Sequence, residues 1–168
     1  MSRNIVFDRE LSRKTHNGVN SMLYVEKIVR ERVFDSIYWK QFCFSLNEAT
    51  LLDKAMELQI IGSFEISGRP FPFICLFVKM VQLAPEREII EFYINQDRFK
   101  YLKVLGLLYA RVVYKDSELI QEHLVDYRKL RIYEDGEYKL TYVDEVVDRL
   151  INEEFFIGLT LTYMAKDG

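Results

Sequence analysis

The sequence predicts a mainly α-helical fold: a single globular domain around a buried central helix at about residues 99–113, with one small β-hairpin at about 129–142. The run 99–113 carries only three strongly polar residues, which fall within an arc of about 80° on a helix. An alternating apolar pattern is confined to residues 129–142, whereas the other apolar stretches recur with helical spacing. The 168 residues, 49% of them apolar, suffice for one core. We therefore expect a domain at 21–168 after a polar arm at 1–20.

The central helix reads FKYLKVLGLLYARVV, and its apolar surface covers most of its circumference. Such a helix has neighbours on most sides. Lys100, Lys103 and Arg111 form the one strip left for solvent or for carboxylate partners. Gly106 costs about 1 kcal/mol relative to alanine inside a helix, so its presence predicts that another element passes close to it. The segment is too short and too charged to span a bilayer, and we expect no membrane partner.

The remaining helices are placed by their start and stop signals. A stripe of 3.6-residue period predicts a helix at 22–36, and an aromatic cluster a short helix at 38–44. Asn47 is the expected cap of the following helix. Prolines predict a helix that starts at PFPF and ends at Ala84, with Pro85 opening the next one, which runs to Asn95. Ser117 is the expected cap of a short helix, and the last helix covers 143–152. Residues 153–168 allow either a short helix or an extended segment.

The hairpin register depends on the loop at Glu134-Asp135-Gly136. A two-residue loop pairs Ile132 with Lys139, which mixes the two faces. A three-residue loop pairs Ile132 with Tyr138 and Leu130 with Leu140, which gives one clean apolar face, and we prefer it. It places Arg131 opposite Lys139, with Lys129 on the same outer face, although like charges opposed across a hairpin are destabilising.

No pattern of residues indicates catalysis. Cys43 and Cys75 lie inside apolar runs and are expected to be buried, reduced thiols. They have no short spacing to His16 or His123, which excludes the usual metal motifs. There is no phosphate loop and no nucleophile motif. The carboxylate pairs Glu86/Glu88 and Asp144/Asp148 are expected on solvated helix faces. The chain is thus predicted to be a non-enzyme without cofactor or metal, a monomer by default, and intracellular since no secretory leader is seen.

Four basic residues of the hairpin region, Arg128, Lys129, Arg131 and Lys139, form the first surface of interest. Two interpretations are open: a solvated face, or a binding site for an acidic peptide or RNA phosphates, which would relieve the mutual repulsion of these residues. The net charge of −3 argues against a large RNA footprint.

The aromatic cluster around Trp39, which also includes Tyr38, Phe42 and Phe44, is the second surface of interest. One interpretation is packing in the core, and the other is an exposed groove for a partner helix.

An ordered series of segments resembles a known family. The series is YVEKIVRERVFDSIYWKQFCFSL, DKAMEL, RPFPFICLFVKMVQLAPEREII, FKYLKVLGLLYARV, DYRKLR and GEYKLTYVDEVVDRLI. It extends from about Leu23 to Ile151 and is similar to the pre-mRNA-splicing factor 38 family. No single segment is a chemical motif, and the order of the series carries the likeness.

The resemblance implies a helical domain with a small hairpin and a non-enzymatic, nuclear component of the spliceosome. It implies association with the tri-snRNP and a requirement in spliceosome activation. The expected role is a scaffold for other splicing proteins, including a zinc-finger protein and an extended helical partner, with no catalytic residues to assign. The alternative is an RNA-binding module that uses the basic hairpin face, with small nuclear RNA as its partner. The chain ends at Gly168 without the long charged tail of many relatives, so functions carried by such tails are not expected.

Overall fold

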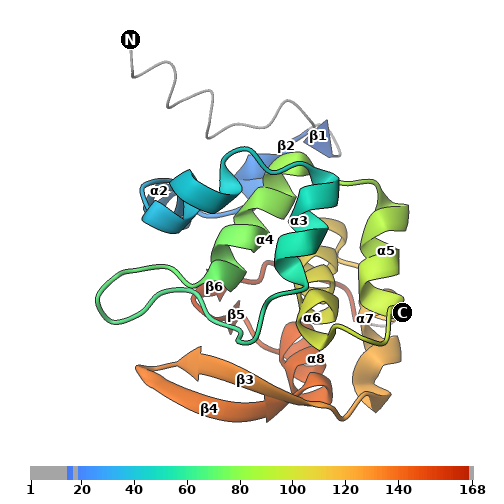
Figure 1. Ribbon diagram of the computed structural model, residues 1–168. Helices are drawn as coiled ribbons and strands as arrows, with labels where there is room; N and C mark the ends of the chain where they lie inside the picture. Colours follow the sequence, from blue (N-terminus) through green and yellow to red (C-terminus); the bar gives the residue numbers. More distant parts are fainter. Residues whose placement is uncertain (1–14, 17–18, 167–168) are drawn as a thin grey trace.

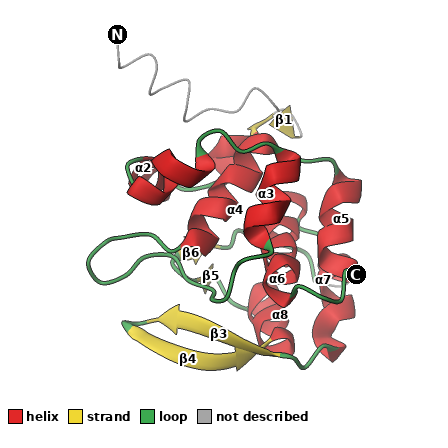
Figure 2. Ribbon diagram, in the orientation of Figure 1, coloured by secondary structure: helices red, strands yellow, loops and turns green. Residues whose placement is uncertain are grey.

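Helix α6 (Lys100–Tyr109) lies at the centre of the structure and continues directly into the π-helix η3 (Ala110–Tyr114). The computed structural model describes residues 15–16 and 19–166, and in it α6 packs against α3, α4, α5 and α8. Every residue from Leu102 to Val113 is buried. The predicted central helix is therefore confirmed, and so is the mainly helical fold, with a hairpin beneath one end of the bundle (Figures 1 and 2).

The close approach expected at Gly106 comes from helix α5 (Arg87–Asn95). A Cβ atom placed on Gly106 would lie 2.9 Å from Cγ1 of Ile94 and 3.2 Å from Cβ of Tyr93. These distances are shorter than ordinary carbon contacts, so the two helices meet where α6 has no side chain.

The basic strip of the central helix is less open than its sequence predicts. Lys103 is buried, and its Nζ lies 2.8 Å from Oδ2 of Asp126, so it does meet a carboxylate. Arg111 is also buried, and it donates to two backbone carbonyls, those of Leu150 and Thr162, each at 2.6 Å. Its guanidinium thus ties the segment after the last helix to the core. Of the three residues, Lys100 alone is partly exposed.

Two expected helix starts are wrong by a residue or more, and one expected helix is divided. The stretch 22–36 forms a 3-10 turn, η1 (Ser21–Tyr24), and then α2 (Lys27–Phe34), because Glu26 is in an extended conformation between them. Asp116, rather than Ser117, caps α7 (Ser117–Gln121) by accepting from the N–H of Leu119. Helix α5 begins at Arg87, two residues after Pro85.

The other predicted helices begin and end close to the expected residues. Asn47 caps α3 (Glu48–Ala55) in a reciprocal capping box with Thr50. Helix α4 (Pro72–Leu83) starts at a proline and ends at Ala84, whose φ of 46° is left-handed. The remaining helical segments are η2 (Trp39–Cys43), η4 (Glu122–Val125) and α8 (Val143–Asn152).

The predicted hairpin register is wrong by one residue. Strands β3 (Lys129–Glu134) and β4 (Glu137–Tyr142) pair Ile132 with Lys139, and Glu134 with Glu137, around a two-residue loop. Asp135 and Gly136 have φ values of 54° and 79°. A turn with two positive φ values matches the twist of the strands, and Asp-Gly is among its preferred sequences. Turn geometry therefore prevails over the clean apolar face, and Arg131 lies opposite Leu140 instead of Lys139.

The C-terminal stretch is extended rather than helical. It forms a small strand pair, β5 (Phe155–Phe156) with β6 (Leu159–Thr160), turned at Ile157 and Gly158. A similar short pair, β1 (Thr15–His16) with β2 (Val19–Asn20), lies at the other end, and most of the predicted arm at 1–20 falls outside the described residues. None of the helices in the described stretch has the length and apolar character needed to cross a membrane.

Candidate interaction surfaces

The outer face of the hairpin carries basic and aromatic side chains together. Residues paired across β3 and β4 share a face of the hairpin. The pairs on the outer face are Lys129 with Tyr142, Arg131 with Leu140, and Tyr133 with Tyr138. Tyr138 and Leu140 are 61% and 60% exposed. The opposite face buries Leu130, Ile132 and Thr141 against the helices. The outer face is therefore amphipathic rather than purely basic, since the observed register moves Leu140 outward.

Two of the four basic residues proposed for this surface are partnered. Arg128 forms an ion pair with Asp126 at 2.7 Å, and the pKa of that carboxyl is held far below its usual range by Arg128 and Lys103. Lys139 shares the inner face with Ile132 and lies 3.5 Å from the carboxylate of Asp135. The hairpin thus does not present four cations together, and Lys129 and Arg131 are the pair that share its outer face.

Trp39 is 2% exposed and belongs to the core. Its ring packs edge-on against Phe34 at 4.7 Å, and Nζ of Lys79 lies 5.2 Å from the ring centroid. The core interpretation of this residue therefore holds, and Trp39 itself offers no open face to a partner. Its neighbours Phe42 and Phe44 are partly exposed at the surface.

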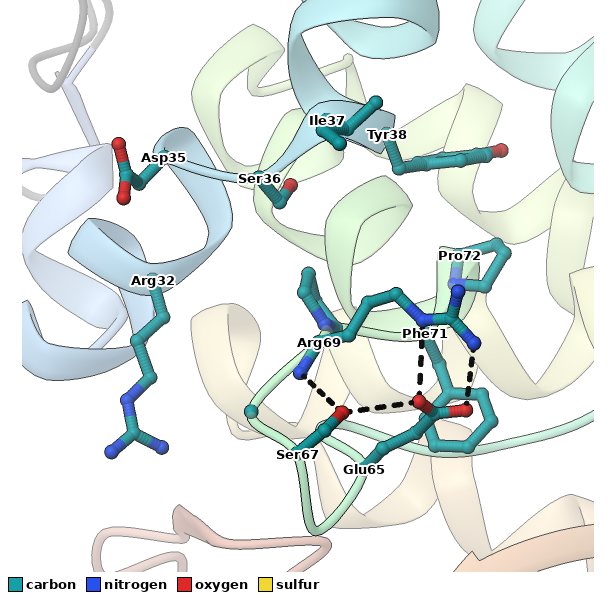
Figure 3. Close-up of a pocket in the computed structure, with 12 residues that line it drawn as sticks. Arg32, Asp35, Ser36, Ile37, Tyr38, Glu65, Ser67, Arg69, Phe71 and Pro72 are labelled. Carbon is teal, nitrogen blue, oxygen red and sulfur yellow. Dashed lines mark hydrogen bonds and ion pairs between the residues drawn. The ribbon is translucent and has the colours of Figure 1, made fainter.

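A groove of about 830 Å³ lies beside the aromatic cluster (Figure 3). One wall is the connection between α2 and η2, where Asp35, Ser36, Ile37 and Tyr38 follow one another. The opposite wall is the loop that leads into α4. Ile37 is 73% exposed, and it is the large apolar side chain of the groove lining that is most open to solvent. The full lining is Arg32, Asp35, Ser36, Ile37, Tyr38, Glu65, Ser67, Gly68, Arg69, Pro70, Phe71 and Pro72.

The loop wall of the groove is held in shape by its own polar contacts. The guanidinium of Arg69 binds the carboxylate of Glu65 through two hydrogen bonds, at 3.2 and 3.1 Å. This bidentate contact lowers the pKa of Glu65. The loop is closed by backbone bonds between Glu65 and Arg69 and between Ser63 and Phe71. The groove is therefore preformed, which reduces the ordering cost of binding.

Sequence reasoning offered a groove at the aromatic cluster as one interpretation, but it did not identify the second wall, because the groove arises from two segments about 30 residues apart. Its signals were weak but present: an isoleucine at position 37 outside the helical stripe, and a polar Gly-containing loop before Pro70 and Pro72. Neither signal says that the two segments face each other.

The buried thiols and the buried histidine of the described residues are held in their uncharged forms. Burial raises the pKa of the Cys43 thiol to about 12 and that of Cys75 further, so both resist ionisation. His123 is buried, and its pKa is lowered to about 4 by desolvation and by the nearby charge of Lys103. Over the described part of the chain, no three or more His, Cys, Asp or Glu residues cluster as metal ligands would.

Comparison with known proteins places the chain in a family. A sequence profile described as the PRP38 family matches residues 14–167. The chain belongs to the PRP38 family. The resemblance carried by the ordered segments is thus confirmed, and the match extends it from Leu23–Ile151 to nearly the whole PRP38 chain.

Curated relatives of this PRP38 protein carry the name Pre-mRNA-splicing factor 38. The protein of Schizosaccharomyces pombe is 47% identical over 140 residues, covering 82% of this chain and 67% of that protein. The Arabidopsis thaliana protein is 39% identical over 158 residues, covering 91% and 44%. Pre-mRNA-splicing factor 38A of Homo sapiens is 39% identical over 158 residues, covering 89% and 50%. The chain thus spans about two thirds of the length of the first relative and half or less of the length of the other two.

The PRP38 chain also shares its fold with a solved structure. A chain in the crystal structure of the Snu23-Prp38-MFAP1(217-258) complex of Chaetomium thermophilum aligns with a TM-score of 0.82 at 36% identity. The alignment covers 89% of this chain and 80% of that chain. A protein of this fold therefore occurs in a complex of three proteins.

Proposed function

We propose that this PRP38 protein is a non-enzymatic interaction scaffold of the spliceosome, associated with the tri-snRNP and required for spliceosome activation in pre-mRNA splicing. The single observation that carries the proposal is the shared fold, at 36% identity, with a chain in the Snu23-Prp38-MFAP1 complex. Membership of a family whose curated relatives are named splicing factors supports it. Since splicing takes place in the nucleus, the protein is expected there.

The partners we propose are a zinc-finger protein and an extended helical protein, in line with the three-protein complex that contains the solved relative. A scaffold needs preformed surfaces on a rigid core, and this chain has both. The central helix is buried from Leu102 onwards. Exposed apolar side chains lie at the groove, where Ile37 is one, and on the outer hairpin face, where Tyr138 and Leu140 are two. Such surfaces hold partners in position without any chemical step.

The proposal is tested by purifying the affinity-tagged chain from its source cells and identifying the proteins bound to it. Tri-snRNP and precatalytic spliceosome proteins should be recovered. Ile37→Arg places a charge in the groove and should remove at least one of these proteins, whereas Ile28→Arg, at a site 55% exposed on α2 outside the groove, should remove none. Recovery of no splicing protein with the unaltered chain would reject the proposal.

The RNA-binding alternative loses support from the geometry of the hairpin. Of its three proposed phosphate contacts, Lys139 lies on the inner face beside Asp135, and only Lys129 and Arg131 remain together. Two cations neutralise at most two phosphates and therefore give only a weak attraction. If the chain did bind RNA through this face, changing Lys129, Arg131 and Lys139 to glutamate would abolish that binding; we expect the unaltered chain to show no salt-sensitive RNA binding for the change to remove.

A further inference from the structure

Strand β4 has one hydrogen-bonded edge and one open edge. On β3, the carbonyl of Arg131 accepts from the N–H of Ile61 at 2.9 Å, and the N–H of Tyr133 donates to the carbonyl of Ile61 at 2.8 Å. These groups point away from β4. Because backbone groups alternate in direction along a strand, the residues of β3 that bond to β4 include Ile132, whose partner is Lys139.

The same alternation fixes the direction of the backbone groups on β4. The N–H and carbonyl groups of Tyr138 and Leu140 point away from β3, and no backbone group in the described residues bonds to them. Figure 1 shows β4 as the outer strand of the hairpin, on the side away from the helices. This edge can therefore accept another strand.

Proteins commonly protect such an edge with proline, a bulge or charged side chains, including charges that point inward. The charged residues of β4, Glu137 and Lys139, lie on its inner face, where Lys139 is paired with Asp135, so its outer face carries no charge of its own. Strand β4 contains no proline, and its pairing with β3 runs through six consecutive pairs without a bulge. The side chains beside the open backbone groups are those of Tyr138 and Leu140, which are among the most exposed large apolar residues of the described chain. The edge thus combines unpaired backbone groups with apolar surface.

The charge beside the edge selects the chemistry of the partner. Arg128, Lys139 and Arg149 each have a carboxylate partner, whereas the side chains of Lys129 and Arg131 have none among the described residues. Arg131 lies opposite Leu140, and an added strand would lie two strand spacings away, about 10 Å. An extended arginine and a facing glutamate or aspartate span that distance together, so acidic residues on the added strand would be favoured.

The face suits a polypeptide better than a nucleic acid. The ring of Tyr133 packs edge-on against Tyr138 at 4.9 Å and is tilted against Phe71 at 5.0 Å. Tyr133 is thus engaged by protein rings on this face, which leaves Tyr138 as its most exposed ring and offers no row of open rings for successive bases. The open backbone groups match those of an extended peptide.

We propose that β4 binds an extended, acidic segment of a partner protein as an additional strand, with backbone bonds to Tyr138 and Leu140 and ion pairs to Lys129 and Arg131. This inference rests on the proposed scaffold function and names one class of partner segment for it. It concerns a surface separate from the groove around Ile37.

The test uses the full chain and a fluorescent hexapeptide of alternating glutamate and valine, with a lysine–valine hexapeptide and oligouridylate as comparison probes. Binding is followed by anisotropy and by amide hydrogen exchange. The acidic peptide should bind most tightly and should slow exchange at Tyr138 and Leu140 by at least about tenfold.

Two variants separate backbone pairing from charge. Leu140→Pro removes an outward N–H that β3 does not use, and it should weaken acidic-peptide binding by at least about tenfold. The double change Lys129→Glu and Arg131→Glu alters only exposed side chains, and it should reverse the preference between the two hexapeptides. Phe92→Ser, which changes an apolar residue of equal exposure (60%) on α5, should alter neither result and is the control.

Binding without protection of Tyr138 and Leu140 would overturn the added-strand geometry. Equal binding of both hexapeptides, tighter binding of oligouridylate, or dimerisation of the chain through β4 would overturn the acidic-peptide assignment. Because co-purification of splicing proteins is a separate measurement, failure of this proposal can be told apart from failure of the scaffold function.

Discussion

At Gly106, helices α5 and α6 lie so close together that no side chain larger than a hydrogen atom fits between them. Gly106→Leu should destabilise the protein by about 1–3 kcal/mol, because a Cβ there would already lie 2.9 Å from Cγ1 of Ile94. Urea denaturation measures the change in the free energy of unfolding. Ala49→Leu, an exposed site on α3, is the control and should have little effect. An unchanged midpoint for Gly106→Leu would show that the helices do not meet there.

His123 links stability to pH because it is buried without a hydrogen-bond partner for Nε2 among the described residues. Its pKa is lowered to about 4, whereas an unfolded histidine titrates near 6.5. Below pH about 6.5 the unfolded chain therefore takes up a proton that the folded chain refuses. The free energy of unfolding should fall as pH drops from about 6.5 towards 4.

Denaturation of the unaltered chain and of His123→Gln at pH 7.5 and pH 4.5 measures this dependence. The variant should lose less stability between the two values, since glutamine does not titrate. Equal losses would assign the pH dependence to other groups. The carboxyl of Asp126, whose pKa is depressed by Arg128 and Lys103, keeps its stabilising charge above about pH 4 and loses it only in stronger acid.

Asp126 forms ion pairs with both Lys103 and Arg128, so removing Asp126 and removing Lys103 should not cost the same stability. Asp126→Asn leaves the buried ammonium of Lys103 without its carboxylate and should cost about 3 kcal/mol. Lys103→Met should cost less, because Arg128 still neutralises Asp126. Urea melts of both variants give the two values, and a larger loss for Lys103→Met would contradict this account.

Among the elements, the hairpin shows where sequence reasoning failed. The strands and the turn position were predicted correctly, but the register was chosen for a clean apolar face. The preference of Asp135 and Gly136 for positive φ decided it instead, and the cost is an exposed Leu140. Helix positions were more predictable, because prolines and the Asn47 cap mark them locally.

Gly136→Ala should destabilise the hairpin by about 1–2 kcal/mol. Its φ of 79° is unfavourable for alanine, and the added Cβ would lie 3.2 Å from Cδ1 of Ile66. Asp135→Asn is the matched control, since asparagine also favours this turn, and it should be nearly neutral. Thermal melts compare the two. A neutral Gly136→Ala would indicate a different turn.

At the scale of the whole molecule, the sequence predicted the core but not the surfaces. The apolar composition of residues 99–113 is enough to predict that this helix is the central one. The groove around Ile37 and the burial of Lys103 and Arg111 depend on which segments meet in space, and nothing local encodes that. The candidate residues Arg128, Lys139 and Trp39 were chosen by type, yet the fold gives each of them a partner or a place in the core.

The central claim is that the chain acts as a scaffold in spliceosome activation. It is tested most directly by depleting the chain from a splicing extract and adding back the purified protein. The account predicts that depleted extract assembles precatalytic complexes but does not splice. Splicing should return in proportion to the added chain until its concentration matches that of the tri-snRNP. Normal splicing in the depleted extract, or full restoration by trace amounts, would contradict it.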